Sequence, residues 1–536
     1  MTSAAAAPTT SPRPAINPWL IAAVVVVPTF MEVLDTTIAN VALRYIAGGL
    51  SASNNDSEWV ITSYLAANAT ILPISGWLSA RLGRRNYFLG SIAVFTIASG
   101  LCGTASSLEE LILFRIIQGL AGGGLQPSSQ AILIDAFPPE KQGSAMTMFA
   151  VAALIAPVVG PTLGGYLTVF HEWRWIFYIN IPVGLLGCLA CYLIVEDSPA
   201  LKQERAALLR RPLNFDYLGL GLLVLGVSCW EVLLSKGQEW DWYADPTWRA
   251  QAMAIGFAAS LLGLIVHESR TPDPVVNFRP LANRNFAACS VIVFCVYGVV
   301  YGASTTLPGL LQTLFSYDAY VSGLVMSPSG IGSVVMLLVT GFLLGRGTDA
   351  RWLVLAGLLL MAAGNYWMVA LNLEISPIFV IGPRVVVFMG VSMIFAPLTV
   401  AAFQGVPPSL RGGAVGLFAL LRNEGGSVGT SLSKTIEQRR SQFHSSRVNE
   451  FLDPFNPQVQ EYLDQGQSTL TQATGDPAGS SSVSLQTLAN LRDQQAGSLA
   501  YFDAFWFFAV LSLSLVVLVF LMRRSVAEKG AAIGAE

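Results

Sequence analysis

Long apolar runs, separated by short polar segments, dominate this chain of 536 residues. A helix of roughly 20 apolar residues crosses the hydrocarbon core of a bilayer. Windows of that length give fourteen candidate spans, at 18–39, 58–80, 86–105, 109–134, 144–168, 174–195, 215–235, 248–267, 285–313, 321–345, 351–371, 377–401, 411–433 and 502–522. Charged residues make up only 12% of the chain, against about 25% in soluble proteins. The sequence therefore predicts an all-α integral membrane protein with 14 transmembrane helices.

The polar segments between these runs predict how the chain is divided. We expect a disordered cytoplasmic tail at 1–17, a six-helix bundle at 18–195, linkers with two inserted helices at 196–284, a second six-helix bundle at 285–522, and a cytoplasmic tail at 523–536. The second bundle contains a long polar loop, 434–501, on the outer side. We expect this loop to be helical over 436–451 and looser over the Gly/Ser-rich stretch 474–484.

Lysine and arginine predict the orientation, because they concentrate in cytoplasmic loops. One set of short loops and the C-terminal tail carry Arg81, Arg84, Arg85, Lys141, Lys202, Arg205, Arg210, Arg211, Arg270, Arg279, Arg284, Arg346, Arg351, Arg411, Arg523, Arg524 and Lys529. The opposite short loops carry only Arg44, Arg174, Lys236 and Arg249. We therefore expect a multi-pass protein of the inner membrane with both termini in the cytoplasm.

Charged residues inside the first and fourth spans are the strongest functional signal. A charge at the centre of a membrane helix costs at least about 2.5–3.5 kcal/mol, so it marks function by default. Glu32 and Asp35 are three residues apart and share a helix face. Burial disfavours the charged form of an acid, so the two could bind and release a proton. Arg115 keeps its charge, which makes Asp35 its expected partner, with Gln118 on the same face.

The second half of the chain carries a matching set of polar residues. Arg384 lies near the start of the twelfth span, and Arg422, Asn423 and Glu424 lie together in the thirteenth. We assign Glu424 to proton coupling, and Gln118, Arg384, Arg422 and Asn423 to the substrate pathway. Arg422 has an open alternative, in which it only extends toward the membrane surface.

Two further segments predict moving parts rather than chemistry. The fifth span holds Pro157, Gly160, Pro161, Gly164 and Gly165, which kink the helix and leave one face bare for close packing. The loop after the second span holds Gly76, Arg81, Gly83, Arg84 and Arg85. We assign both sets to gating. The glycines of the fifth span are echoed by Gly425, Gly426 and Gly429 in the thirteenth, as expected for an internal repeat.

Other classes of function find little support in the sequence. It has no G-x-x-x-x-G-K-[ST] phosphate loop, and its three histidines lie far apart, so we expect no metal site and no cofactor beyond a proton gradient. Cys188 and Cys191 are spaced C-x-x-C inside an apolar run, where packing is the better interpretation. The chain carries no basic block for nucleic acid. We predict a secondary transporter rather than an enzyme; a membrane scaffold or sensor is the competing class.

Several motifs point to one family. They are residues 34–42 (LDTTIANVA), the loop 76–85 (GWLSARLGRR), Phe114-Arg115 with Gln118-Gly119, residues 156–165 (APVVGPTLGG), residues 173–184 (WRWIFYINIPVG), and Arg422 with residues 425–430 (GGSVGT). Together they resemble the major facilitator superfamily, and within it the fourteen-helix drug:proton antiporters of the EmrB/QacA type. The long outer loop resembles that of EmrB-like pumps.

This resemblance implies a major facilitator fold with a 6+2+6 arrangement of helices and proton-coupled efflux of multiple drugs and other lipophilic compounds. It also implies a tripartite pump, with a periplasmic adaptor and an outer-membrane channel as partners besides the substrates and the lipid bilayer. The alternative is a dedicated exporter of a lipid, fatty acid or metabolite on the same fold. The chain departs from the family at Ala80, where many members have an acid, and at Glu32 and Glu424.

Overall fold

The computed structural model describes residues 17–137, 139–197, 199–210, 216–271, 274–372, 376, 378–453 and 455–524. Across these residues the chain forms helices and their connections, and no strand. Helices suit a lipid environment, because each helix satisfies its own backbone N–H and C=O groups without water. The predicted tails at 1–17 and 523–536, and residues 211–215 of the predicted linker, lie wholly or largely outside the described residues.

The helices follow one another along the chain with few long connections. The first group is α1 (Pro18–Gly49), α2 (Asn54–Ser57), α3 (Trp59–Leu82), α4 (Arg84–Thr104), α5 (Leu108–Gly122), α6 (Leu125–Ala136), α7 (Pro139–Phe170), α8 (Trp175–Tyr178) and α9 (Asn180–Ile194). Next come α10 (Pro199–Arg210), α11 (Tyr217–Lys236) and α12 (Arg249–Arg270), with short 3₁₀ turns at Trp242–Ala244 and Arg279–Ala282. The last group is α13 (Arg284–Thr313), α14 (Ala319–Met326), α15 (Ser329–Gly345), α16 (Ala350–Val369), α17 (Ile378–Phe403), α18 (Pro408–Asn449), α19 (Pro457–Thr474), α20 (Pro477–Ser514) and α21 (Val516–Leu521).

Eleven helical segments of the described chain are long and apolar enough to cross a membrane. The other three predicted spans coincide with α3, with α5 and α6 together, and with α18. These three carry polar side chains such as Asn68, Arg115 and Glu424, which lower their mean hydropathy. The all-helical membrane architecture is confirmed, and the predicted count of fourteen spans is consistent with it.

Four of the predicted spans are interrupted rather than continuous: 109–134, 174–195, 321–345 and 502–522. The span 109–134 breaks between α5 and α6 at Gly123 and Gly124, where the backbone passes close to Asn68 and Tyr87 of neighbouring helices. The span 321–345 breaks between α14 and α15 at Pro328, which has no N–H to continue the helix ladder. Each of these two breaks lets one span change direction inside the bundle.

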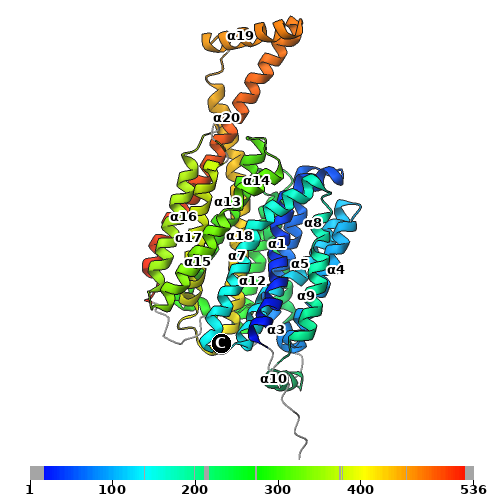
Figure 1. Cartoon of the computed structure of the whole chain (residues 1–536), viewed down its shortest axis with the longest axis vertical. Coiled ribbons are helices and arrows are strands. Elements are labelled where there is room, and N and C mark those ends of the chain that lie inside the picture. Colours follow the sequence, from blue (N-terminus) through cyan, green and yellow to red (C-terminus); the bar gives the residue numbers. More distant parts are fainter. Residues whose placement is uncertain are drawn as a thin grey trace, which may run out of the picture.

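The helices form two side-by-side groups (Figure 1). Helices α1, α4, α5, α8 and α9 lie on one side, and α13 and α15 to α18 on the other. We call the end from which α19 projects the extension end, and the end where α10 lies the linker end. The chain returns to the linker end after α21, where the Arg523 backbone N–H donates to Asn285 Oδ1 at the start of α13 (3.0 Å).

The polar segment 434–501 is a helical arm. Helix α18 continues to Asn449, α19 crosses the top, and α20 returns into the bundle (Figure 1). The prediction of a looser stretch at 474–484 is wrong. Gly475, with φ +73°, ends α19, and Asp476 caps α20 by accepting from the backbone N–H of Ala478 and Gly479. These capping residues produce a sharp turn between two helices instead of a flexible loop.

The inserted helix α11 contacts both halves of the bundle. Its Ser235 hydroxyl accepts from the Thr62 hydroxyl of α3 at 2.8 Å. On its other side, the Leu234 carbonyl accepts from the Ser431 hydroxyl of α18 at 2.6 Å. Helix α12 packs against α11 and is the more exposed of the two. The insert therefore lies along the seam where α3 meets α18.

The glycine-rich face of α7 packs against two different helices. Gly160 and Gly164 face Thr37 and Ile38 of α1, and a Cβ added at Gly164 would lie 3.1 Å from Ile38 Cγ2. Gly165 faces α14, where an added Cβ would lie 2.6 Å from the Tyr320 backbone nitrogen. Since α7 and α14 belong to different halves, this contact holds the halves together at the extension end.

We expect Gly165→Leu to destabilise the closed extension end. Overpacking a tight contact costs about 1–3 kcal/mol, so the apparent melting temperature of the detergent-purified protein should fall. Gly341→Leu is the matched control, because a Cβ at Gly341 meets nothing within 4 Å. Equal melting temperatures for the two variants would show that the α7–α14 contact is not tight.

Candidate functional site

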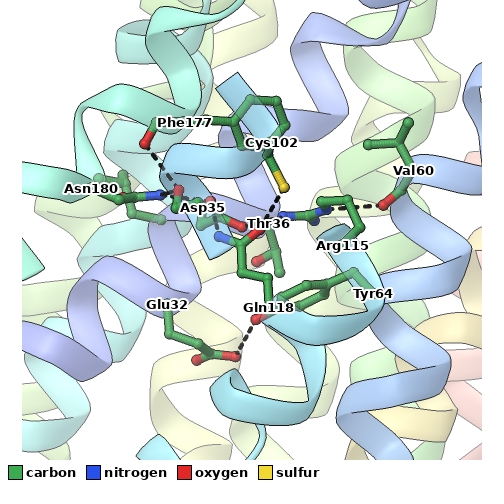
Figure 2. A network of polar contacts seen from close by, with 12 residues as sticks. Glu32, Asp35, Thr36, Val60, Tyr64, Cys102, Arg115, Gln118, Phe177 and Asn180 are labelled. Carbon is green, nitrogen blue, oxygen red and sulfur yellow. Dashed lines mark hydrogen bonds and ion pairs between the residues drawn. The ribbon is translucent and has the colours of Figure 1, made fainter. Parts of the chain in front are cut away.

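A buried ion pair between Asp35 and Arg115 forms the centre of the first half (Figure 2). Arg115 Nη1 lies 2.5 Å from Asp35 Oδ2, and both side chains are almost completely buried, with exposed fractions of 0% and 1%. Asp35 lies in the middle of α1 and Arg115 in the middle of α5. The pairing predicted from the sequence is therefore present.

Neutral donors complete the coordination of this pair. The second oxygen of Asp35 accepts from Gln118 Nε2 at 3.0 Å and from Asn180 Nδ2 at 2.7 Å. Arg115 Nε donates to the carbonyl of Val60 at 3.0 Å, and its guanidinium lies 4.2 Å from the ring centroid of Tyr64. Four helices, α1, α3, α5 and α9, thus supply partners for two buried charges.

Glu32 lies one turn before Asp35 and has a different environment. Its carboxylate accepts from the Tyr64 hydroxyl (3.2 Å), Asn68 Nδ2 (3.3 Å) and Gln126 Nε2 (2.8 Å). All three donors are neutral. Among the described residues, no cation lies within ion-pair distance of Glu32, although the side chain is only 4% exposed. The hydrogen bonds of Glu32 thus come from neutral groups, whereas Asp35 has a guanidinium as its partner.

Gln126 links Glu32 to the second half of the protein. Its amide nitrogen donates to Glu32, and its amide oxygen accepts from Arg422 Nη2 of α18 at 2.9 Å. Arg422 also lies 5.5 Å from the ring centroid of Tyr297 on α13. The chain Glu32–Gln126–Arg422 is thus a polar connection that crosses from one half to the other.

A cavity of about 440 Å³ lies between the halves and reaches the linker end. Its inner end carries Gln126 and Arg422, and its linker end carries Gly83, Arg84 and Asp197. The rest of the wall is mainly apolar and comes from α3, α6, α7, α15, α17 and α18, with Leu72, Pro73, Phe149, Leu337, Phe395, Phe403 and Phe418 among its residues. Such a lining suits a lipophilic molecule with one polar group.

The loop motif after α3 forms part of the rim of this cavity. Gly83 has φ +90°, a conformation that favours glycine, and it turns the chain sharply into α4. Arg84 forms an ion pair with Asp135 of α6, so an acid from another helix neutralises it although position 80 is alanine. Arg85 donates through Nη2 to the carbonyl of Tyr192 at 2.6 Å, and Arg81 accepts at its carbonyl from Arg205 of α10 at 3.0 Å.

The remaining predicted site residues lie in different places. Arg384 is buried on α17 and donates to the Ser304 hydroxyl of α13 at 2.8 Å, away from the residues that line the cavity. Gln118 lies inside the Asp35 network and not on the cavity wall. Glu424 faces Glu231 of the inserted helix, and the Asn423 side-chain nitrogen has no hydrogen-bond partner.

Five site residues were not predicted from the sequence: Tyr64, Asn68, Gln126, Asp135 and Asn180. Asn180 stands inside the motif 173–184, and Asn68 and Gln126 are amides within otherwise apolar spans. A polar residue inside a motif or an apolar span was the signal that the sequence offered for these three sites. Buried charges one turn apart, a cavity between two halves and a polar connection that joins the halves suit a secondary transporter. Within the described residues, no group of three or more His, Cys, Asp or Glu could hold a metal ion.

Comparison with known families agrees with this geometry. The sequence model of the Major Facilitator Superfamily matches residues 26–430, which is most of the chain. The chain therefore belongs to the major facilitator superfamily, a class of membrane transporters and not of enzymes.

Within the superfamily, the chain is similar to export proteins of the EmrB type. It is 38% identical over 442 residues to the multidrug export protein EmrB of Haemophilus influenzae, covering 82% of this chain and 84% of that protein. EmrB of Escherichia coli (strain K12) is 35% identical over 439 residues, covering 82% and 83%. The fatty acid resistance protein FarB of Neisseria gonorrhoeae is 36% identical over 434 residues, covering 81% and 83%. The resemblance to EmrB-like pumps is confirmed.

Solved structures share the fold at low sequence identity. The human organic anion transporter MFSD10 (TETRAN) matches with a TM-score of 0.56 and 14% identity, covering 95% of this chain and all of that chain. A bacterial homologue of the human lysosomal transporter Spinster, inward-facing and occupied, matches with a TM-score of 0.56 and 15% identity, covering 94% and 96%. These matches support the major facilitator fold alone.

We expect Asp35→Asn to destabilise the protein more than Glu32→Gln does. Removing one partner of a buried ion pair costs about 3–5 kcal/mol, because the other charge stays buried without compensation. Glu32→Gln removes no partner of a cation and should cost less. Thermal melting of the purified variants measures both effects. The double variant Asp35→Asn/Arg115→Gln should recover part of the loss; a double variant as unstable as the sum of its single changes would contradict the pairing.

Proposed function

We propose that this protein exports small lipophilic compounds from the cytoplasm across the inner membrane in exchange for protons. The Lys and Arg residues of the loops support a cytoplasmic position for the linker end. The cavity between the halves is then the substrate site, open to the cytoplasm. Similarity to EmrB multidrug export proteins supports the direction of transport and the substrate class.

The observation that carries this proposal is the polar connection from Glu32 through Gln126 to Arg422. Gln126 and Arg422 line the cavity, whereas Glu32 lies behind them and does not. A substrate that binds Gln126 or Arg422 therefore competes with the contact that holds the ionised form of Glu32. Substrate binding and proton binding are thereby linked at one pair of side chains, as antiport requires.

The exchange follows from the charges in the network. When Glu32 takes up a proton, its attraction for the Gln126 amide weakens, and the connection between the halves weakens with it. Protonation of Asp35 would release Arg115, whose charge must then find another acceptor inside the membrane. Asp35 and Glu32 are thus the proton-carrying groups, and Arg115 and Gln118 set the state of Asp35. No cofactor beyond the proton gradient is required.

Alternating access follows from the two ends of the bundle. The extension end is held by the backbone contact between α7 and α14 at Gly165 and Gly323. The linker end is open at the cavity, with the Arg84–Asp135 ion pair at its rim. Rocking of the halves that separates α7 from α14 and closes this rim would deliver the substrate to the opposite side.

A dedicated exporter of fatty acids or similar amphipathic anions is the second candidate. Arg422 on the cavity wall has no carboxylate within ion-pair distance among the described residues, so its charge is available to an anionic head group. The apolar wall would accommodate the hydrocarbon chain. Similarity to the fatty acid resistance protein FarB supports this alternative.

We expect Asp35→Asn and Glu32→Gln to abolish proton-driven transport. Inverted membrane vesicles with an acid interior should accumulate ethidium or a fluorescent long-chain fatty acid with the unaltered protein and fail to do so with either variant. The probe that the unaltered protein accumulates more strongly decides between the two candidate substrate classes. Asp35→Asn should still exchange substrate across vesicles without a pH gradient, because the cavity is unchanged.

Asp493→Asn is the matched control for these two variants. Asp493 is an exposed acid on the helical arm and should have no effect on transport. Full activity of Asp35→Asn across the pH range, or accumulation that persists after the pH gradient is collapsed, would contradict proton exchange.

We further propose that the helical arm docks a periplasmic adaptor, which in turn contacts an outer-membrane channel. The arm projects beyond the bundle (Figure 1), and Phe451 and Phe455 at its bend are 71% and 85% exposed. Exposed aromatic side chains are typical anchors of protein interfaces. At its base, Asp503 of α20 accepts from Arg440 of α18 (2.5 Å) and contacts His444 (2.7 Å), which fixes the direction of the arm.

Replacing 445–496 by a short Gly/Ser linker should separate docking from transport. The replacement keeps Arg440, His444 and Asp503, so the base of the arm stays intact. We expect loss of export from intact cells and retention of transport in proteoliposomes, which contain no adaptor. Export that survives the replacement in intact cells would show that the arm is solvated without a partner.

A further inference from the structure

We propose that Glu231 and Glu424 form a second proton site, in which two buried carboxylates share one proton. The pair lies between the inserted helix α11 and α18, outside the network of Asp35 and Glu32. This inference rests on the proposed proton exchange. It gives Glu424, which the sequence already assigns to coupling, a partner on the inserted helix α11.

The helix packing places these two acids together. Helices α11 and α18 run in the same direction, and the Ser431 hydroxyl donates to the Leu234 carbonyl at 2.6 Å. Ser427 lies one turn closer to the linker end than Ser431 does, and it is beside Glu231. Glu424 lies on the same helix, one turn closer still to the linker end. Trp230 lies against Glu424 and stacks on Phe257 of α12, with ring centroids 4.4 Å apart. Aromatic rings thus cover the pair on the α12 side.

The polar atoms of the pair lack hydrogen-bond partners. Glu231 is 3% exposed, and its Oε1 accepts no hydrogen bond. Both carboxylate oxygens of Glu424 are buried and accept none either. The hydroxyl of Ser427, whose residue is 6% exposed, is buried beside Glu231 and makes no hydrogen bond of good geometry. Native proteins rarely leave buried polar groups unsatisfied, so these atoms indicate a bound species.

Five basic groups on the surrounding helices have other partners. From α11 itself, Lys236 pairs with Asp56 (3.7 Å) and Glu239 (2.7 Å) at the extension end. At the same end, Lys434 of α18 pairs with Glu58 next to α3 (2.5 Å). On α12, Arg249 pairs with Asp245 and His267 with Asp216, at opposite ends of the helix. Arg422 of α18 donates to Gln126. Among the described residues, no cation lies within ion-pair distance of Glu231 or Glu424.

Two neighbouring carboxylates in an apolar site repel each other when both are ionised. Burial and the like charge of the neighbour both favour uptake of a proton. One proton converts one acid into an O–H donor and leaves the other as its acceptor, with a net charge of −1. A second proton makes the pair neutral. Sodium or calcium would require more oxygen ligands than two carboxylates and one hydroxyl supply, so a proton fits this site best.

The position of the pair gives its protonation a mechanical consequence. Helix α11 is bound to α3 through Ser235 and to α18 through Leu234, so it bridges the two halves. When the shared proton leaves, repulsion between the carboxylates pushes α11 away from α18. When it returns, the two helices are joined again. The charge state of the pair therefore biases the rocking of the halves, and the inserted helices take part in coupling.

Infrared spectroscopy tests the pair without substrate or gradient. Protonated carboxyl groups give a carbonyl band that shifts in deuterated water. The double variant Glu231→Gln/Glu424→Gln should lack one such band that the unaltered protein shows at neutral pH. As the pH is raised, each single variant should lose its band at a lower pH than the unaltered protein does. The reason is that the one remaining carboxyl group has no charged neighbour. Glu461→Gln, an exposed glutamate on α19, should leave the spectrum unchanged.

Several outcomes would overturn the inference. A double variant that retains every protonated carboxyl band shows that the pair holds no proton. Single variants that titrate like the unaltered protein show that the two acids do not share one. A band that appears in choline chloride and is absent in sodium chloride shows that the site holds a sodium ion instead. The two single glutamine changes lie on different helices. If one single variant misfolds, the other still provides the test.

A transport assay supplies the second test. One proton moving down a gradient of one pH unit supports about a tenfold concentration ratio. If the pair carries one of the exchanged protons, the double variant should accumulate ethidium to a level roughly tenfold lower than the unaltered protein at this gradient. Unchanged accumulation contradicts a role in coupling. Ethidium export that needs no gradient in the unaltered protein would refute the proposed antiport, while the infrared result on the pair would stand.

Discussion

The cost of a permanent charge inside hydrocarbon is the constraint on which the first half of the protein depends. Arg115 cannot lose its proton, so it must have acceptors at its own depth in the membrane. Asp35 supplies one at 2.5 Å and Val60 supplies another at 3.0 Å. Asn180 and Gln118 then satisfy the remaining oxygen of Asp35. Satisfying one guanidinium thus fixes the relative positions of α1, α3, α5 and α9.

The sequence predicted the features that depend on a single helix or on charge. Apolar windows located the spans, and the permanent charge of Arg115 predicted Asp35 as its partner. Residues that act through tertiary contact were missed, because an amide such as Asn180 or Gln126 looks the same in a sequence whether it faces lipid, cavity or carboxylate. The turn at Gly475 and Asp476 was missed for another reason. Serine and glycine composition suggested a loose segment, whereas the two caps decide the local structure.

The internal repeat is visible in how glycine positions pack. In α7, Gly160 and Gly164 face the backbone and side chains of α1, the first helix of their half. In α18, Gly425 and Gly429 face Phe294 and Gly298 of α13, the first long helix of the other half. Each half therefore joins its first and fifth spans by a close contact that larger residues would prevent. Close contacts of this kind tie the two spans of each pair together.

The repeat has nevertheless diverged where charge is concerned. Arg384 is a buried arginine of the second half, on α17, and its neighbours differ from those of Arg115. It donates to the Ser304 hydroxyl, and the ring of Phe388 lies 4.3 Å from its guanidinium, whereas Arg115 has an aspartate. Among the described residues, Arg384 has no acid within ion-pair distance. The second half instead contributes Arg422 and the aromatic wall to the cavity. Gln126 of the first half donates to Glu32 and accepts from Arg422 of the second half, so it joins Glu32 to the cavity that both halves line.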